Sequence, residues 1–301
     1  HQKLLMEKLK RENLNKLMGK TAIKSIDLFS HIKNDNVFKI LNLAEKNKFN
    51  IWIVGGALRD FFLKKNINDF DFVYDINPIE LVEILKTNEL DFISSYINFG
   101  VIIINLNNKK YTLTSLREDF KQDGRFTEVR YIKSINKDSL RRDLTFNSLY
   151  MDTNQRVYDF HNGLKHLENS KVIFIGDFKK KCLEDHLRIM RFIRFCSLFK
   201  SPMYPDEYIS FFLKNKNLIS NLKHIKLSNE IEKALSYKYK ENTISILKKL
   251  HNSNAKKLLF LRSNHLNSYW GKEEQENHKE GWIAWQRWRL ACVQTPGCFP
   301  A

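Results

Sequence analysis

The chain has 301 residues, 43% of them hydrophobic and 28% charged, so it can bury a core in one large or two to three small domains. It contains no run of eighteen apolar residues, and no membrane span is therefore expected. The formal net charge of +17 indicates contact with a polyanion such as nucleic acid, although a coding bias towards Lys, Asn and Ile would produce the same excess.

Cysteine usage indicates a reducing compartment. The four cysteines form no C-x-x-C pair, and no histidines accompany them at zinc-binding spacing. The basic, helix-like stretch 3–20 lacks the apolar core of a signal peptide. We therefore expect a cytoplasmic protein, or a mitochondrial one if the source is eukaryotic.

The first half of the chain is predicted to mix helices and strands. Residues 1–48 are expected to be mostly helical, and a buried strand, a glycine turn, a helix start and a second strand follow. A helix with proline in its first turn comes next, and then two strands around an Asn-Asn hairpin turn. The two strand pairs are expected at 51–54, 69–74, 101–106 and 110–116, and the helix at 78–87.

The second half is predicted to be helical. The polar segment 117–126 is expected to be a mobile loop, with an ordinary solvated connection as the alternative, and a strand at 127–132 follows it. Helices are then expected at 182–199, 205–214, 229–237 and 243–251. Residues 270–301 are poor in Lys and rich in Trp, and we expect them to pack poorly onto the fold. The predicted class is α+β, a small mixed sheet with helices followed by an all-α part.

Two aspartates and two glycines form the first candidate site. Asp69 and Asp71 lie two residues apart on a predicted strand, so their carboxylates project from the same face. Paired carboxylates repel unless a cation lies between them, and Mg²⁺ prefers such hard oxygen ligands and commonly partners substrate phosphates. The Gly55-Gly56 turn allows a phosphate chain to approach backbone N–H groups at a helix start. This combination predicts a metal-dependent site for a nucleoside triphosphate.

Two further clusters add groups that can hold a nucleotide. Arg141, Arg142, Asp143 and Asn147 fall within seven residues, and arginine forks match phosphate oxygens. The alternative is a capped helix start with surface charges.

The other cluster is Asp185, Arg188 and Arg191, which would share one face of a helix. An Asp/Arg pair on a rigid helix can accept the amino donor and ring acceptor of cytosine and adenine and reject uracil and guanine. The alternative is an intrahelical salt bridge.

Together these clusters resemble those of the class II tRNA nucleotidyltransferases, the CCA-adding enzymes, which share their head domain with bacterial poly(A) polymerases. The resemblance covers about residues 37–200 and fades by about 260. The matching segments are Gly55-Gly56-x-x-Arg59-Asp60, Asp69-x-Asp71, Arg141-Arg142-Asp143, Asp159-x-x-x-Gly163-x-x-x-Leu167 and Glu184-Asp185-x-x-Arg188.

The resemblance implies a five-stranded head followed by helical neck, body and tail domains. It implies transfer of C and A from CTP and ATP to the 3′ end of tRNA without a template, with two Mg²⁺ ions held by Asp69 and Asp71. The triphosphate would lie near Gly55, Gly56 and Arg59. The incoming nucleotide would contact Arg141, Arg142, Asp143 and Asn147, and its base would be read by Asp185 and Arg188, with Arg191 beside them. The domains expected on this basis are a head at 1–165, neck helices at 166–200, a body at 201–269 and an atypical, disordered or foreign segment at 270–301.

Residues 117–126 resemble the flexible loop that allows family members to add the terminal A. Its polar members are Arg117, Asp119, Asp123, Gly124 and Arg125. One departure concerns Thr112, which stands where the family usually has an acidic residue, and this would weaken metal affinity or the positioning of the attacking hydroxyl. Two alternatives therefore stay open, a poly(A) polymerase acting on general RNA and a catalytically weakened RNA-binding remnant.

Overall fold

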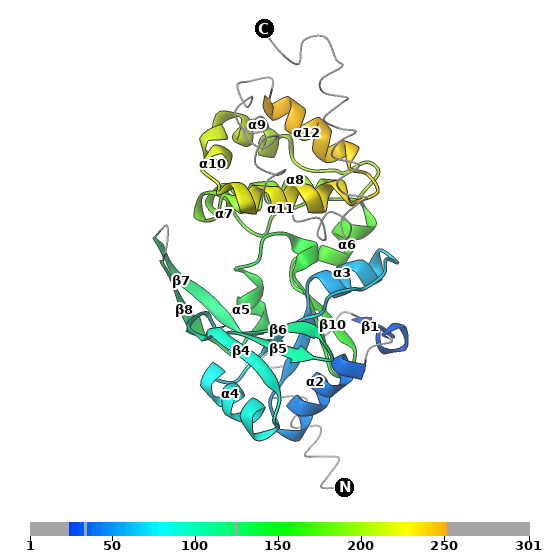
Figure 1. The fold of residues 1–301 in the computed structure, drawn as a ribbon. Coiled ribbons are helices and arrows are strands. Elements are labelled where there is room, and N and C mark those ends of the chain that lie inside the picture. The colour runs from blue at the N-terminus through cyan, green and yellow to red at the C-terminus, as the bar shows by residue number, and fades with distance from the viewer. Residues whose placement is uncertain (1–23, 33–34, 124–125, 252–301) are drawn as a thin grey trace, which may run out of the picture. The chain divides into compact units, whose positions relative to one another are not determined.

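The computed structural model describes residues 24–32, 35–123 and 126–251, which divide into two compact units (Figure 1). The first unit comprises the described residues up to Asn169 together with Ile173–Gly176, and the second comprises Ser170–Val172 and the described residues from Asp177 onward. Within these ranges, every helix is too short or too polar to cross a membrane. The predictions for residues 1–23 and 270–301 lie outside the described residues.

Eight strands of the first unit form one mixed sheet in the order β1-β10-β9-β2-β3-β6-β5-β4. β3 and β6 pair in parallel, and the other neighbours are antiparallel. The bounds are β1 Lys24–Ser25, β2 Ile51–Val54, β3 Asp71–Tyr74, β4 Asp91–Tyr96, β5 Val101–Leu106, β6 Lys109–Ser115, β9 Leu149–Asp152 and β10 Arg156–Asp159.

The strands predicted at 51–54, 101–106 and 110–116 are thereby confirmed. Asn107 and Asn108 have φ values of 50° and 59°, as a tight hairpin between β5 and β6 requires. The strand predicted at 69–74 begins two residues late, so Asp69 precedes it. The five-stranded head implied by the resemblance is wrong in strand number, because β9, β10 and the short β1 extend the sheet beyond β2.

A second, two-stranded sheet joins β7 (Arg117–Asp123) to β8 (Phe126–Tyr131). The strand predicted at 127–132 is confirmed within a residue at each end. The loop predicted at 117–126 is wrong for residues 117–123, which form β7 and pair with β8, with a register shift between Asp119 and Lys121. Polar composition suggested a loop, but cross-strand backbone hydrogen bonds form regardless of side-chain polarity.

The two faces of the large sheet pack differently. One face carries the buried side chains of Trp52, Val54, Val73 and Tyr150. The opposite face carries Tyr111, whose hydroxyl accepts a hydrogen bond of 3.3 Å from Asn36 Nδ2 on α2 (Asp35–Lys46). Figure 1 shows α2 together with α4 (Pro78–Thr87) on this side.

The helices of the first unit follow local signals only in part. Asn77 accepts a hydrogen bond from Ile79 N and caps α4 ahead of Pro78, which confirms that helix. The other helices are α3 (Gly56–Phe62), α5 (Ile135–Ser139) and α6 (Gly163–Glu168), with 3-10 turns at Phe29–His31, Ile97–Phe99 and Thr145–Asn147. The mostly helical prediction for residues 1–48 is confirmed for α2 and is wrong at β1, which forms by antiparallel pairing with β10.

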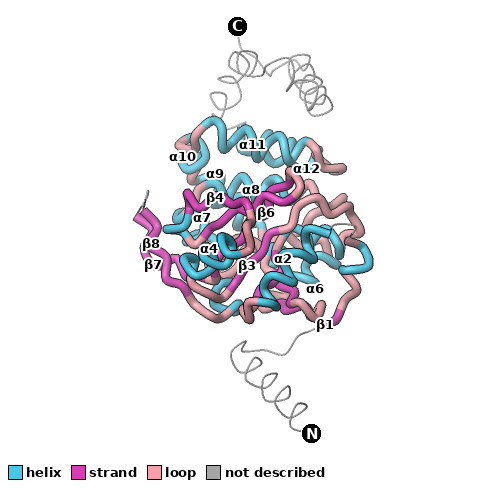
Figure 2. Tube along the Cα trace, turned by 60° about the horizontal axis from the view of Figure 1, so that its bottom comes forward, coloured by secondary structure: helices cyan, strands magenta, loops and turns pink. Residues whose placement is uncertain are grey.

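The second unit is helical, as Figure 2 shows. Its helices are α7 (Phe178–Glu184), α8 (Leu187–Cys196), α9 (Asp206–Lys214), α10 (Lys216–Ser220), α11 (His224–Leu235) and α12 (Glu241–His251). α8 is its centre: Arg194 pairs with Glu230 of α11 at 2.8 Å, and Thr243 of α12 donates to the carbonyl of Ile193.

The single helix predicted at 182–199 is wrong, because the chain breaks between α7 and α8. Asp185 has φ −143° and ψ 103°, an extended conformation that ends α7. Its carboxylate then accepts a 3.0 Å hydrogen bond from Leu187 N at the start of α8. The local hydrogen bonding of Asp competes with helix continuation, and here it separates two helices whose apolar periodicity runs on.

Candidate active site

One row of paired residues crosses four strands at one end of the large sheet. Tyr150 of β9 pairs with Val54 of β2, Val54 with Asp71 of β3, and Asp71 with Thr112 of β6. Residues paired in this way point to the same face. Neighbouring strands lie about 4.8 Å apart, so the backbone at Tyr150 is about 10 Å from that at Asp71. The row brings an exposed carboxylate, a hydroxyl and an aromatic ring together at one end of these four strands.

The Gly55 turn continues β2 directly beyond this row. Gly55 has φ +73°, where an L side chain is strained, and its N–H donates to the carbonyl of Leu149 at 3.1 Å. A Cβ there would lie 3.8 Å from Nη1 of Arg142. The turn therefore presents bare backbone between the arginine and the strand end that carries Asp71.

Arg59 and the Asn147 cluster support this turn from the side of α3. Arg59 Nη1 donates to Oδ1 of Asn147 at 3.0 Å, and its other nitrogens bind both oxygens of Asp60 at 2.9 Å. Asn147 Nδ2 donates to Asp143 Oδ1 at 3.4 Å. Arg59, Asp143 and Asn147 are all buried, so this part of the predicted nucleotide site is a fixed, hydrogen-bonded frame.

Asp138 is a residue that the sequence analysis missed, and it organises the two arginines. Its carboxylate is fully buried and accepts hydrogen bonds from Arg141 Nε at 2.8 Å and Arg142 Nη2 at 3.2 Å. Tyr150 Oη donates to it at 2.7 Å and the backbone N–H of Arg117 at 3.2 Å. Asp138 lies on α5, three residues before Arg141, and this spacing is the one sequence signal that could have revealed it.

The electrostatics of this cluster keep Asp138 charged and the Tyr150 phenol protonated. Burial alone would raise the pKa of Asp138, but Arg142 and Arg141 outweigh it and hold that pKa below its ordinary value. Burial raises the pKa of the Tyr150 phenol, which therefore stays protonated as a donor. The Arg142 guanidinium also lies 5.0 Å from the Tyr150 ring centroid, so its orientation is fixed from two sides.

The fourth matching segment, which begins at Asp159, has a structural part in this frame. Asp159 at the end of β10 accepts backbone hydrogen bonds from His161, Gly163 and Leu164 at 2.8–3.2 Å. A Cβ on Gly163 would lie 2.5 Å from the carbonyl oxygen of Thr145, so only glycine fits there. This close approach packs α6 against the 3-10 turn that ends in Asn147.

In the second unit, the predicted base-reading residues are arranged differently from the expectation. Asp185 is exposed in the break between α7 and α8 and does not share a helix face with Arg188. Arg188 is buried, and its Nη1 donates to Glu184 Oε2 at 2.9 Å and to the carbonyl of Lys181 at 3.1 Å. Arg191 follows one turn later on α8, half-buried.

The predicted loop residues lie on the small sheet of the first unit. The backbone of Arg117 is tied to Asp138, and its Nε lies 3.3 Å from Asp119 Oδ1. Arg117 Nη1 also donates to the carbonyl of Phe99. Asp123 ends β7, and Gly124 and Arg125 lie outside the described residues.

The carboxylates of Asp69 and Asp71 are too few to hold a divalent cation alone, but they suffice when substrate phosphates complete its ligands. Asp69 and Asp71 are exposed, with buried Phe70 between them, as alternation requires. Within the described residues, no group of three His, Cys, Asp or Glu side chains could hold a metal. Thr112 pairs with Asp71 and thus occupies the expected third position. Mg²⁺ is commonly held by one or two carboxylates plus substrate phosphates, so the pair fits that ion.

Comparisons with known proteins agree with this geometry. Residues 51–173 match the family described as Poly A polymerase head domain, and this range covers the large sheet from β2 to β10. The chain is 34% identical over 168 residues to the mitochondrial CCA tRNA nucleotidyltransferase 1 of Danio rerio, covering 56% of this chain and 39% of that protein. It is 33% identical over 213 residues to the CCA-adding enzyme of Bacillus pumilus, covering 69% of this chain and 51% of that protein.

A solved structure of the Bacillus stearothermophilus CCA-adding enzyme in complex with CTP has the same fold, with a TM-score of 0.62 at 23% identity over 71% of this chain and 51% of that chain. Residues 51–173 therefore belong to the head-domain family to which class II CCA-adding enzymes and bacterial poly(A) polymerases are related. It spans between 39% and 51% of the length of the two relatives named above.

Proposed function

We propose that this protein is a template-independent nucleotidyltransferase that adds C and A from CTP and ATP to the 3′ end of tRNA. The observation that carries the proposal is the row from Tyr150 to Thr112, which sets Asp71, the Gly55 turn and Arg142 at one sheet edge. A triphosphate needs these three things together, namely metal-binding carboxylates, bare backbone and a fixed guanidinium. Relatives with this fold are described in complex with CTP and with tRNA.

The residues around the Gly55 turn are proposed to bind the triphosphate or to support the groups that bind it. The backbone at Gly55 and Gly56 approaches the phosphates, and Arg142 donates to their oxygens while Asp138 and Tyr150 hold its plane. Arg59 and Asn147 keep the turn in place. Because these groups are fixed before a nucleotide arrives, little is lost in ordering them when charge develops on the phosphates.

Asp69 and Asp71 are proposed to hold Mg²⁺. Members of this family normally use a divalent metal, which supplies charge neutralisation at the phosphates and a more acidic 3′-hydroxyl. The two carboxylates would hold the ion, and the ion would supply its charge to the triphosphate. Thr112 contributes a neutral hydroxyl beside them, so ion affinity in the absence of nucleotide is expected to be low.

Base selection is proposed to belong to Asp185 and Arg188. Asp185 is exposed and can accept from an exocyclic amino group, and Arg188 is oriented by Glu184 to donate to a ring nitrogen. We further propose that the helices at 166–200 serve as a neck and those that follow as a body, and that the β7–β8 hairpin acts in A addition. The net charge of +17 favours an RNA substrate. A cytoplasmic location is part of the proposal, and the mitochondrial alternative is supported by a mitochondrial relative.

Thr112 favours one second candidate, an RNA-binding remnant with weak catalysis. A neutral side chain beside Asp71 leaves the pair without a third charge, and this would weaken metal binding. A poly(A) polymerase is the alternative within the family.

A transfer assay separates these functions. The full chain is incubated with tRNA lacking CCA, Mg²⁺ and labelled CTP, ATP or both, and product lengths are read on a gel. We expect extension by three nucleotides that requires both nucleotides. Long tails from ATP alone would indicate a poly(A) polymerase, and no incorporation alongside retained tRNA binding would indicate the remnant.

A further inference from the structure

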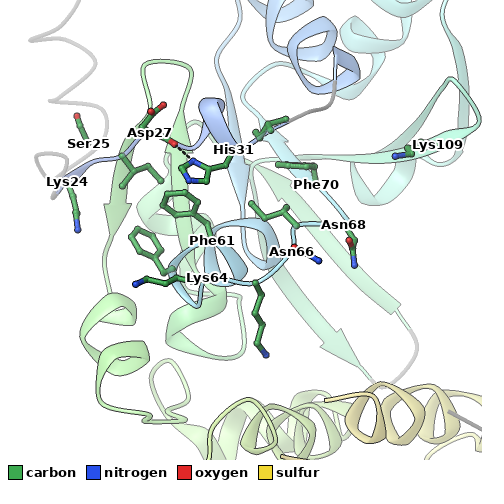
Figure 3. Close-up of a pocket in the computed structure, with 15 residues that line it drawn as sticks. Lys24, Ser25, Asp27, His31, Phe61, Lys64, Asn66, Asn68, Phe70 and Lys109 are labelled. Carbon is green, nitrogen blue, oxygen red and sulfur yellow. Dashed lines mark hydrogen bonds between the residues drawn. The ribbon is translucent and has the colours of Figure 1, made fainter. Parts of the chain in front are cut away.

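A large basic pocket lies in the first unit, and neither Asp69 nor Asp71 is among the residues that line it. Its volume is about 1230 Å³, and it is formed by the β1 segment, the connection from α3 to β3 and the start of β6. Four lysines line it, namely Lys24, Lys64, Lys65 and Lys109, against one acidic side chain, Asp27. Figure 3 shows Lys24 and Lys64 on one side and Lys109 on the other. Its charge is therefore suited to an anion with several phosphates.

Aromatic rings lie among these lysines. Phe61 and Phe62 line the pocket and are half-buried, so part of each ring remains open to it. His31 packs edge-on against Phe61 with ring centroids 5.3 Å apart, and Lys24 Nζ lies 5.9 Å from the Phe62 ring centroid. Rings interleaved with cations are the arrangement by which proteins hold single-stranded nucleic acid, stacking the bases and tracking the backbone.

The pocket is continuous with the segment that carries the candidate metal ligands. Asn66 and Asn68 line it, and so does Phe70, which is 5% exposed between Asp69 and Asp71. Because side chains alternate, Phe70 points away from the face on which those two carboxylates lie. Single-stranded nucleic acid bound in this pocket would therefore lie on the opposite face from the two carboxylates and not in the candidate active site.

We propose that this pocket binds a single-stranded stretch of the RNA substrate, away from its reacting 3′ end. Its four exposed lysines contact the phosphates, and Phe61 and Phe62 stack against bases without reading their sequence. The identification of this RNA as the substrate rests on the proposed function, but the binding itself does not. The volume exceeds what one nucleotide needs, which favours a strand over a free nucleotide.

Binding is tested with a labelled single-stranded RNA of about 12 nucleotides, within the usual range of site sizes, by fluorescence anisotropy in EDTA without nucleotide. Lys64→Ala with Lys109→Ala is the pocket variant. Lys48→Ala with Lys86→Ala is the matched control, since both pairs are exposed and Lys48 shares the positive φ of Lys64, 58° against 54°.

For single-stranded RNA, each lost phosphate contact reduces the slope of log K against log salt concentration by about 0.7. The pocket variant loses two lysines, so its slope should be smaller by about 1.4, and at 0.1 M salt it should bind about 25-fold more weakly. The control should bind as the wild type does. Equal affinities of the pocket variant and the control would overturn the proposal.

A third variant separates RNA from free polyphosphate. Phe61→Leu, checked for folding by circular dichroism, should weaken RNA binding at least about fivefold without changing the slope, and should leave binding of inorganic triphosphate unchanged. An unchanged RNA affinity would mean a site for phosphate ions only and would overturn the assignment to RNA. Because no transfer is measured, these results stand whether or not the chain adds nucleotides to tRNA.

Discussion

Asp138→Asn tests the buried cluster that fixes the two arginines. The substitution keeps the volume and one carbonyl oxygen but removes the charge that Arg141 and Arg142 face at 2.8 Å and 3.2 Å. Removing one partner of a buried ion pair costs about 3–5 kcal/mol. Because both arginine side chains are 17% exposed and water can reach them, we expect the lower end, about 3 kcal/mol of unfolding free energy.

The stability difference between the wild type and Asp138→Asn should depend on pH in a defined direction. The folded pKa of Asp138 lies below the unfolded one, so its contribution is fully present above the unfolded pKa of about 3.9 and is lost as pH falls through the folded value. The difference in stability between wild type and variant should therefore be constant near neutrality and shrink below about pH 4.

Urea unfolding followed by circular dichroism measures both effects. Glu83→Gln is the matched control, because it removes an exposed carboxylate paired with Lys86 at 2.8 Å and should cost less than about 0.5 kcal/mol. A loss for Asp138→Asn no larger than that of the control would refute the reasoning, as would a difference that grows in acid.

Four further outcomes are expected. Asp69→Ala should abolish transfer and leave unfolding free energy unchanged, whereas Glu80→Ala on the surface of α4 should alter neither; near-normal turnover would contradict the assignment. Asp185→Ala should relax discrimination against UTP more than it weakens triphosphate binding, and unchanged selectivity in the gel assay would remove its base-reading role. Thr112→Asp should strengthen Mg²⁺ binding in calorimetry without nucleotide, because it places a third carboxylate opposite Asp71, and equal affinity would show that the ion lies elsewhere. Burial raises the pKa of the Cys182 thiol to about 12, so iodoacetamide at about pH 8.5 should leave it unmodified in the folded chain; labelling detected by mass spectrometry would contradict its burial.

Much of the head could be predicted from the sequence because its signals are local. The Asn107-Asn108 turn, the Asn77 cap and the apolar run of β2 each have a mechanism within a few residues. Signals of this kind also predicted the glycine turn at Gly55 and the helix that starts after it.

The parts that were missed depend on contacts distant in sequence. Asp138 is important through Tyr150 and Arg117, which come from two strands that no local pattern brings together. The β7 strand is polar and forms through pairing with β8. Asp185 interrupts an apolar periodicity that continues across it, and its extended backbone and its hydrogen bond to Leu187 N reveal the break.

Incorporation of labelled CTP and ATP into a tRNA that ends before CCA tests the central claim most directly. The CCA-adding enzyme of Bacillus pumilus serves as the positive control, and the variant lacking both Asp69 and Asp71 carboxylates as the negative one. We predict extension by three nucleotides with the wild-type chain and none with the variant. A wild-type chain that leaves the tRNA unextended, where the Bacillus pumilus enzyme extends it, would contradict the proposed function.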